Sequence, residues 1–277
     1  MLPPKYEGER YKLWTGDSLK VLQTFPDECV HLIVTSPPYF VKSKPYTNLP
    51  DDLENLPTWK EYLSKLLTIL TECARVLVAG GRLCINISDS WTNFRREGVN
   101  KCLPTHAHII VHLTDNCGLE YKGSIIYSQI RRIHASGGGQ YLRGTFPFPP
   151  DIPLVNFYEY ILVFKKAGKR KDISRERKQA SKLGKEELLW CSTGIWELEA
   201  SRERNVCPFP FPPELPYRLI KLFSFVDDIV LDPFVGSGTT IYAALQLGRI
   251  GWGIDISEPY IDYVHYNLRQ EGRNLFE

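Results

Sequence analysis

The sequence predicts an α/β fold whose sheet is mainly parallel and carries helices on both faces. Short apolar runs rich in β-branched residues alternate with amphipathic segments of helical length, the order that βαβ units produce. Two of these runs, 30–35 and 229–232, stop abruptly at proline or glycine turns. The 277 residues suffice for one large domain, or one domain with an insertion, around a full hydrophobic core.

The first half of the chain shows the clearest helix, at 59–78. Its apolar side chains, among them Tyr62, Leu66 and Leu70, recur on one stripe, and the helix is expected to end at Gly80 and Gly81. The other expected elements are strands at 11–15, 30–35, 82–87, 123–128 and 158–164 and helices at 18–25 and 103–113. A loop rich in glycine and proline, 136–153, is too long for a simple connection, so we expect it to be functional.

The second half begins with a basic segment. Between Lys165 and Lys185 lie ten lysines or arginines against two acids, Asp172 and Glu176. Such a run is either a solvated, mobile segment or a surface that contacts phosphates, and composition alone leaves both open. A segment dense in proline and phenylalanine, 208–216, follows; then come helices at 219–225, 239–247 and 258–269 and strands at 229–232 and 250–255.

The tetrapeptide Ser36-Pro37-Pro38-Tyr39 directly follows the strand at 30–35. Proline lacks an N–H and restricts φ, so the chain stays extended past the end of the sheet. The turn presents a hydroxyl, a carbonyl and an aromatic ring at the carboxyl end of a strand, where open α/β sheets bind ligands. This set suits a flat, polar molecule that bears an amino group.

A glycine turn, 232–240, connects a second buried strand to a helix. It lacks the lysine of a phosphate-binding P-loop, and Ile241 stands where the dinucleotide motif GxGxxG needs glycine. Its helix N-terminus suits a carboxylate, and Asp255 at the end of the next strand is placed to hold ribose hydroxyls. The predicted ligand is a nucleoside with an amino-acid tail, and S-adenosyl-L-methionine fits that description.

Composition excludes several other classes. No apolar run is long enough to span a membrane, and residues 1–5 show no secretory signal. Seven scattered cysteines without a CxxC pair indicate reduced thiols in a cytoplasmic protein and no metal site.

Together these motifs resemble the beta-class amino-methyltransferases of DNA, in which the S/D/N-P-P-Y/F tetrapeptide precedes the cofactor motif. Here Ser36–Tyr39 precedes 234–238, and the basic segment lies between them. Further matches are Gly16-Asp17, Arg75-Val76-Leu77 with Gly80-Gly81, 143–147, 159–166 and 207–212 leading to Leu219-Ile220. Cys207 is a small departure, because histidine is more usual there. The resemblance covers almost the whole chain.

The resemblance implies a seven-stranded, mixed but mostly parallel sheet of the Rossmann-like S-adenosyl-L-methionine-dependent type, with an inserted DNA-recognition region. The expected parts are a catalytic half (1–164), a basic target-recognition insertion (165–204) and a cofactor-binding half (205–277). Ser36, Pro37, Pro38 and Tyr39 would hold the target base. The cofactor residues carried over are Asp17, Pro208, Phe209, Asp232, Pro233, Phe234, Gly236, Ser237, Gly238, Thr239, Asp255 and Ile256.

The substrate implied is double-stranded DNA with the target base flipped out of the stack. Serine at position 36 resembles the subset that methylates cytosine N4, and adenine N6 is the alternative. The basic residues expected to contact DNA, mostly at phosphates, are Arg131, Arg132, Arg143, Lys169, Arg170 and Lys171. The sequence leaves open a homodimer and a cognate restriction endonuclease as partners.

Two rival functions from other classes also fit parts of the sequence. One is a methyltransferase for RNA or for a protein glutamine, which the motif order disfavours, because the glutamine enzymes usually carry the cofactor motif first. The other is a catalytically silent DNA-binding module, which the two intact motifs disfavour.

Overall fold

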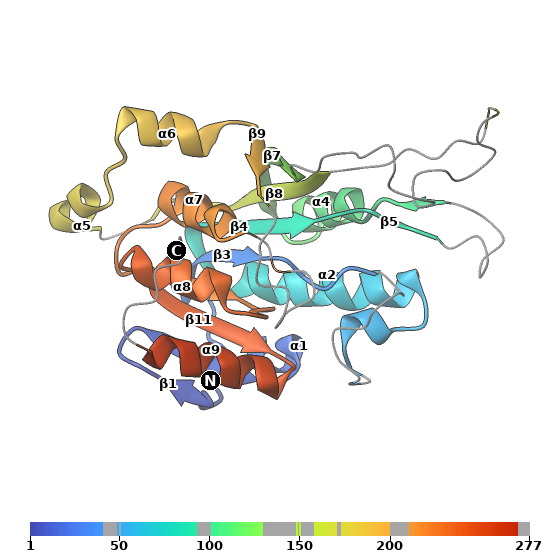
Figure 1. The fold of residues 1–277 in the computed structure, drawn as a ribbon, viewed down its shortest axis with the longest axis horizontal. Coiled ribbons are helices and arrows are strands. Elements are labelled where there is room, and N and C mark those ends of the chain that lie inside the picture. The colour runs from blue at the N-terminus through green and yellow to red at the C-terminus, as the bar shows by residue number, and fades with distance from the viewer. Residues whose placement is uncertain are drawn as a thin grey trace.

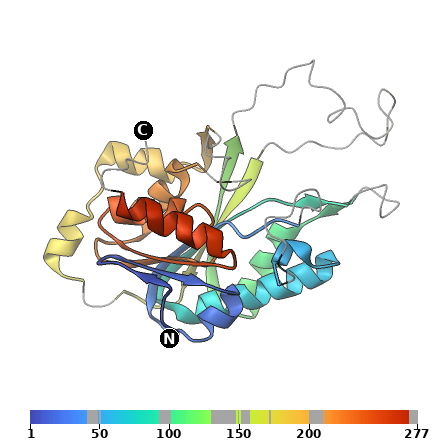
Figure 2. The same ribbon diagram turned by 60° about the horizontal axis from the view of Figure 1, so that its bottom comes forward.

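The computed structural model describes residues 1–40, 49, 51–92, 101–129, 148, 150, 158–170, 173–199, 210 and 212–270. Their main feature is one sheet that runs through both halves of the chain, shown as a ribbon in Figures 1 and 2. The strand order is β1-β2-β11-β10-β3-β4-β8-β7-β9. The strands are β1 (Tyr6–Glu7), β2 (Tyr11–Thr15), β3 (Val30–Thr35), β4 (Leu77–Ile87), β7 (Leu119–Gln129), β8 (Tyr158–Lys166), β9 (Ile195–Leu198), β10 (Ile229–Asp232) and β11 (Ile250–Asp255).

The predicted α/β class and the mostly parallel sheet are confirmed, but the strand count is not. In the described part of the chain the sheet has nine strands instead of the expected seven. The two additional strands lie at its edges, where β1 pairs antiparallel with β2 and β9 pairs parallel with β7. Of the eight neighbouring pairs, those of β2–β11, β11–β10, β10–β3, β3–β4 and β7–β9 are parallel.

Helices cover both faces of the sheet. One face packs against α1 (Ser18–Leu22), α2 (Trp59–Val76) and α4 (Thr105–Asp115), and its core includes Leu66, Leu70 and Ile33. The other face packs against α7 (Glu214–Phe223), α8 (Thr239–Gln246) and α9 (Glu258–Arg269). Alternation along β2 shows the division: Trp14 joins the first core and Leu13 the second.

Some expected boundaries were wrong for clear physical reasons. The helix at 59–78 ends at Val76, and the two glycines lie inside β4, where the pairing with β3 is shifted. Gly80 has φ +74°, and a Cβ there would lie 2.8 Å from the backbone nitrogen of Arg170. The glycine therefore permits both the irregular strand and the close passage of the basic segment.

The helix expected at 219–225 begins five residues earlier, at Glu214, so that Pro216 lies in its first turn. A proline is tolerated there because the N–H groups of the first turn have no partner within the helix. The helix expected at 103–113 is α4, which begins at Thr105, after the short strand β6 (Cys102–Leu103) that pairs with β5 (Ser90–Trp91). A 3₁₀ turn, η1 (Leu53–Asn55), precedes α2.

The basic segment packs on the protein body. It contains α5 (Arg175–Ala180) and leads into α6 (Lys185–Ser192); Figure 1 shows both at the outside of the molecule. Arg170 and Arg177 both bind Asp228, a carboxylate with no exposed surface, at 2.7 Å and 2.8 Å. Burial by itself would raise the pKa of Asp228, but the hydrogen bonds from Arg170 and the Phe225 backbone and the charges of His31 and Arg170 outweigh this and lower the pKa.

Among the described residues no helix is long and apolar enough to cross a membrane. In the same residues no group of three or more histidine, cysteine or acidic side chains could hold a metal ion.

Candidate active site

The predicted site residues lie where parallel strands end at one edge of the sheet. β3 leads into Ser36, β10 ends at Asp232, β11 ends at Asp255 and β2 leads into Gly16. Because β2, β11, β10 and β3 are consecutive and parallel, their carboxyl ends share this edge. The two motifs, about 200 residues apart in sequence, are joined by a hydrogen bond of 2.7 Å from the Thr35 hydroxyl to Asp232.

Asp232 organises the start of the glycine turn. The carboxylate, 1% exposed, accepts hydrogen bonds from Thr35 Oγ1, from Thr240 Oγ1 at 2.7 Å and from the Phe234 backbone nitrogen at 3.0 Å. Burial raises the pKa of Asp232 to about 6, although these three donors counteract the rise. Both oxygens are thus engaged within the protein, and the side chain fixes β3, the turn and α8 relative to one another.

Asp255 ties the glycine turn to the end of β11. Its two oxygens accept hydrogen bonds of 2.8 Å from the backbone nitrogens of Gly236 and Ser257. Burial raises the pKa of Asp255 to about 7, and the charge of Asp232 adds to the rise. A carboxylate oxygen can accept two hydrogen bonds, so each oxygen retains capacity for a ligand hydroxyl.

The glycine turn needs a left-handed residue where α8 begins. Gly238 has φ +88°, and a Cβ there would lie 2.8 Å from the Val264 side chain. Gly236 also has a positive φ, of 49°. Ser237 and Thr239 are linked through their hydroxyls at 3.3 Å, and Ile256, next to Asp255, is partly exposed at the same strand end.

Asp17 lies at the N-terminus of α1, beside the turn that follows β10. It accepts a hydrogen bond from the Leu19 nitrogen at 2.8 Å and pairs with Lys65 at 2.9 Å. Burial opposes ionisation, but Lys65 outweighs it, so the pKa of Asp17 is lowered. The neighbouring Ser18 donates a hydrogen bond of 2.5 Å to the Pro233 carbonyl, which links this segment to the cofactor motif.

The Ser36–Tyr39 turn contacts two polar residues that the sequence analysis did not single out as site residues. Asn86, 2% exposed, donates from Nδ2 to Glu159 Oε2 at 2.6 Å and to Tyr39 Oη at 2.9 Å, and it lies 3.4 Å from Ser36 Oγ. Tyr39 Oη donates to Glu159 Oε2 at 2.8 Å and lies 3.3 Å from Ser36 Oγ. The Pro38 carbonyl accepts a hydrogen bond of 2.9 Å from Tyr62. Glu159 begins the 159–166 segment that matches the family, whereas the signal for Asn86 was a lone polar residue in the apolar end of β4.

The predicted DNA-contact residues are only partly described. Lys169 is exposed, whereas the Arg170 guanidinium is bound to Asp228, so a phosphate would have to compete with that ion pair. The remaining predicted site residues, Arg131, Arg132, Arg143, Lys171, Pro208 and Phe209, lie outside the described residues, as does most of the 136–153 loop.

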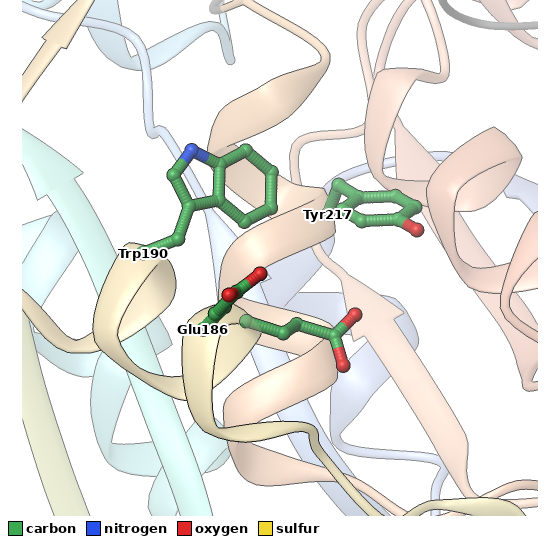
Figure 3. A pocket seen from close by; sticks show the side chains of 4 residues that line it. Glu186, Trp190 and Tyr217 are labelled. Carbon is green, nitrogen blue, oxygen red and sulfur yellow. The ribbon is translucent and has the colours of Figure 1, made fainter.

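A separate pocket of about 420 Å³ lies between α6 and α7 and contains none of the predicted site residues. Figure 3 shows Trp190 and Tyr217 on opposite sides of it, with Glu186 between them; Glu187 completes the lining. Lys221 binds Glu187, and the Arg218 guanidinium lies 4.2 Å from the centre of the Trp190 ring. Two carboxylates in the wall make this pocket unfavourable for a phosphate.

Comparison with known proteins gives a consistent relationship. A family model described as DNA methylase, which joins N6 and N4 methyltransferases, matches residues 30–265. The Type II methyltransferase M.MjaI of Methanocaldococcus jannaschii is 33% identical over 91% of this chain and 90% of its own length. The structure of a putative DNA modification methylase from Thermus thermophilus, complexed with S-adenosyl-L-methionine, superposes with TM-score 0.74 at 32% identity and covers 94% of each chain.

A more distant structure supports the fold alone. PvuII DNA methyltransferase (cytosine-N4-specific) is 18% identical and superposes with TM-score 0.70 over 99% of this chain and 92% of its own. The family match spans well over half of the sequence, and both motifs lie within its bounds. The chain belongs to the DNA methylase family of N6 and N4 amino-methyltransferases.

Proposed function

We propose that this protein transfers the methyl group of S-adenosyl-L-methionine to the exocyclic N4 of a cytosine flipped out of double-stranded DNA. The observation that carries the proposal is the Thr35–Asp232 hydrogen bond, because it joins the base-binding turn to the cofactor turn. A methyl donor and a base held by these neighbouring segments would meet at one edge of the sheet.

The donor would occupy the turn between β10 and α8. Asp255 would accept hydrogen bonds from the ribose hydroxyls, since both of its oxygens keep acceptor capacity. Gly236, Gly238 and the start of α8 would receive the methionine carboxylate at a helix N-terminus. Asp17 and Ile256 would lie at the adenine; Pro208 and Phe209 would close the pocket. Asp232, Pro233, Phe234, Ser237 and Thr239 would shape the turn around the methionine part.

The acceptor base would be held by the Ser36–Tyr39 turn. An exocyclic amino nitrogen is a poor nucleophile, because its lone pair is delocalised into the ring. Acceptors at Ser36 Oγ and the Pro37 carbonyl would bind its two hydrogens and favour a tetrahedral nitrogen. The nitrogen would then attack the methyl carbon in line with the C–S bond, S-adenosylhomocysteine would leave as the neutral thioether, and the amino group would release one proton to solvent. Positioning would be the main contribution to this transfer. Stacking on Tyr39 would contribute about 1–3 kcal/mol toward the cost of extruding the base.

Cytosine N4 is favoured over adenine N6 by serine at position 36, since the family resemblance associates aspartate more often with adenine. Adenine N6 remains the alternative, because both bases present a similar amino edge. RNA or glutamine methylation and a silent DNA-binding module are the remaining candidates, and the same assay separates them.

The segment 165–204 would face the DNA as the target-recognition insertion, between a catalytic part (1–164) and a cofactor part (205–277). Lys169, Lys171 and the arginines at 131, 132 and 143 would hold phosphates. M.MjaI is named as a Type II methyltransferase, which supports a role in restriction–modification and, with it, a cognate endonuclease. A homodimer is a further candidate partner, and a cytoplasmic location fits a DNA substrate.

The test is an incubation with methyl-labelled S-adenosyl-L-methionine and genomic DNA, with RNA and a protein extract as parallel acceptors. Label in DNA, abolished by Ser36→Ala while the donor still binds by calorimetry, is the expected result. Label confined to RNA or protein, or donor binding without any transfer, would refute the proposal.

A further inference from the structure

The hydrogen bonds around Tyr39 can be assigned a direction. Asn86 Nδ2 carries two hydrogens and lies nearest Glu159 Oε2 (2.6 Å) and Tyr39 Oη (2.9 Å). The orientation of this amide is determined, because its carbonyl oxygen could not lie 2.6 Å from a carboxylate oxygen. Glu159 Oε2 accepts hydrogen bonds from both Asn86 Nδ2 and Tyr39 Oη.

The same argument assigns the donor and the acceptor between Ser36 and Tyr39. The single hydroxyl hydrogen of Tyr39 is donated to Glu159 at 2.8 Å, so Tyr39 can only accept from Ser36, 3.3 Å away. The Ser36 hydroxyl hydrogen thus points toward Tyr39, and Ser36 Oγ, which also lies 3.4 Å from the donor Asn86 Nδ2, keeps acceptor capacity for a ligand. Ser36 therefore donates to Tyr39, and Tyr39 in turn donates to the Glu159 carboxylate.

From this arrangement we infer that Glu159 is a specificity-determining residue that keeps Ser36 a hydrogen-bond acceptor. The inference rests on the proposed function and deepens it. An acceptor at Ser36 can accept a hydrogen bond from the exocyclic amino group of cytosine or adenine. Binding of thymine, uracil or guanine is disfavoured, because each presents a keto oxygen at the corresponding position and two acceptors would then face each other.

Asn86 holds the same cluster together through its amide nitrogen, which donates to Glu159 and Tyr39. Its Oδ1 is buried and has no hydrogen-bond partner among the described residues, which costs free energy that the contacts of the amide nitrogen must offset. Ser36 Oγ is therefore the acceptor that this cluster offers to a substrate.

Three variants separate this role from a purely structural one. Glu159→Gln keeps a carbonyl oxygen that can accept from Tyr39 and Asn86, so the direction survives without the charge. Glu159→Leu removes the acceptor, so the Tyr39 hydroxyl turns to donate to Ser36, which reverses the direction. Tyr39→Phe keeps the stacking ring but removes the link between Ser36 and Glu159.

The experiment uses the full-length protein, S-adenosyl-L-methionine and a duplex that contains the site mapped from methylated genomic DNA. kcat should fall on the order of 10- to 100-fold in Glu159→Leu and less in Tyr39→Phe, while Glu159→Gln stays within about threefold of wild type. Donor affinity and the melting temperature should change little in Glu159→Gln and Tyr39→Phe.

A second readout compares binding of duplexes with cytosine or uracil at the target position (adenine or hypoxanthine if the target is adenine), with S-adenosylhomocysteine present. Wild type and Glu159→Gln should prefer the amino base, and Glu159→Leu and Tyr39→Phe should lose that preference. Unchanged preference in both of the latter variants, or a loss in Glu159→Gln as large as in Glu159→Leu, would overturn the inference. A wild-type protein that binds donor but labels no DNA would instead remove the proposed function itself.

Discussion

The hydroxyl of Thr35, the last residue of β3, donates a 2.7 Å hydrogen bond to Asp232, the last residue of β10. This contact lies one residue before Ser36 and one residue before Pro233, so both functional turns begin at the same buried carboxylate. The hydroxyl of Thr240, in α8, donates a hydrogen bond to the other carboxylate oxygen of Asp232.

Replacing Asp232 should therefore affect folding as well as ligand binding. Asp232→Ala leaves two buried hydroxyl donors, of Thr35 and Thr240, and the part-buried Phe234 N–H without an acceptor. Each buried donor without an acceptor costs about 1–3 kcal/mol. We expect a clear loss of unfolding free energy in urea and weaker donor binding by calorimetry. Asp232→Asn, which keeps one acceptor oxygen, should lose less of both. Equal stability of Asp232→Ala and wild type would contradict this role.

The pH dependence of donor binding should depend on Asp255. Because the folded-state pKa is raised to about 7, the carboxyl group is increasingly protonated below that pH. Ribose hydroxyls donate to the ionised form, so donor affinity should rise as the pH increases through this pKa. Asp255→Asn should bind more weakly and without this pH dependence. Calorimetry on both sides of the pKa provides the measurement; an identical pH profile in the variant would refute the assignment.

The same raised pKa has a consequence for stability. Between the ordinary value of 3.8 and about 7 the folded protein binds more protons at Asp255 than the unfolded chain does. The unfolding free energy contributed by this group therefore falls as pH rises through that window and levels off above it. Urea unfolding of wild type and Asp255→Asn at several pH values should show a smaller downward slope in the variant.

Lys169 and Arg170 are neighbours with different expected roles. Arg170→Met removes one of the two arginines that bind the buried Asp228 and should cost about 1–3 kcal/mol of stability. Lys169→Ala, at an exposed position, should leave stability unchanged and weaken DNA binding. The slope of the logarithm of the DNA-binding constant against the logarithm of salt concentration should fall by about one. Urea unfolding and fluorescence anisotropy at several salt concentrations test the pair. Similar stability losses in both variants would contradict the structural role of Arg170 and the DNA-contact role of Lys169.

Gly238 should not tolerate a side chain. Alanine there would adopt φ +88° and contact Val264, a strain of about 1–3 kcal/mol. We expect Gly238→Ala to unfold at lower urea concentration and to bind the donor more weakly. Gly194→Ala is the matched control, because a Cβ at Gly194 meets nothing within 4 Å. If the two variants behave alike, the turn does not require a left-handed residue.

The elements that could be predicted from sequence are those with both a buried apolar run and a sharp terminator. The strands at 30–35, 229–232 and 250–255 and the helix at 258–269 have the expected bounds. The strands β1 and β9 were missed because they are only two and four residues long. Both lie at the edges of the sheet, so each pairs with a single neighbouring strand. β4 was expected too short at its start, since Gly80 and Gly81 were interpreted as the end of the preceding helix and instead form an irregularity within the strand.

The site was only partly visible in the sequence for a related reason. Ser36 and Asp232 belong to local motifs that carry their own turn residues. Glu159 belongs to the 159–166 match and Asn86 to no motif, and neither assignment places the side chain at Tyr39. The two residues meet Tyr39 because β8 returns antiparallel beside β4. That pairing depends on the long connections of the sheet, which local pattern does not determine.

Nucleoside analysis of the methylated DNA tests the central claim most directly. After incubation with S-adenosyl-L-methionine, the DNA is digested to nucleosides and separated by mass spectrometry. N4-methylcytosine is the expected product, and its absence in the Ser36→Ala variant ties it to this site. N6-methyladenine would correct the base and keep the site, whereas 5-methylcytosine or unmodified DNA would contradict amino methylation at the Ser36–Tyr39 turn.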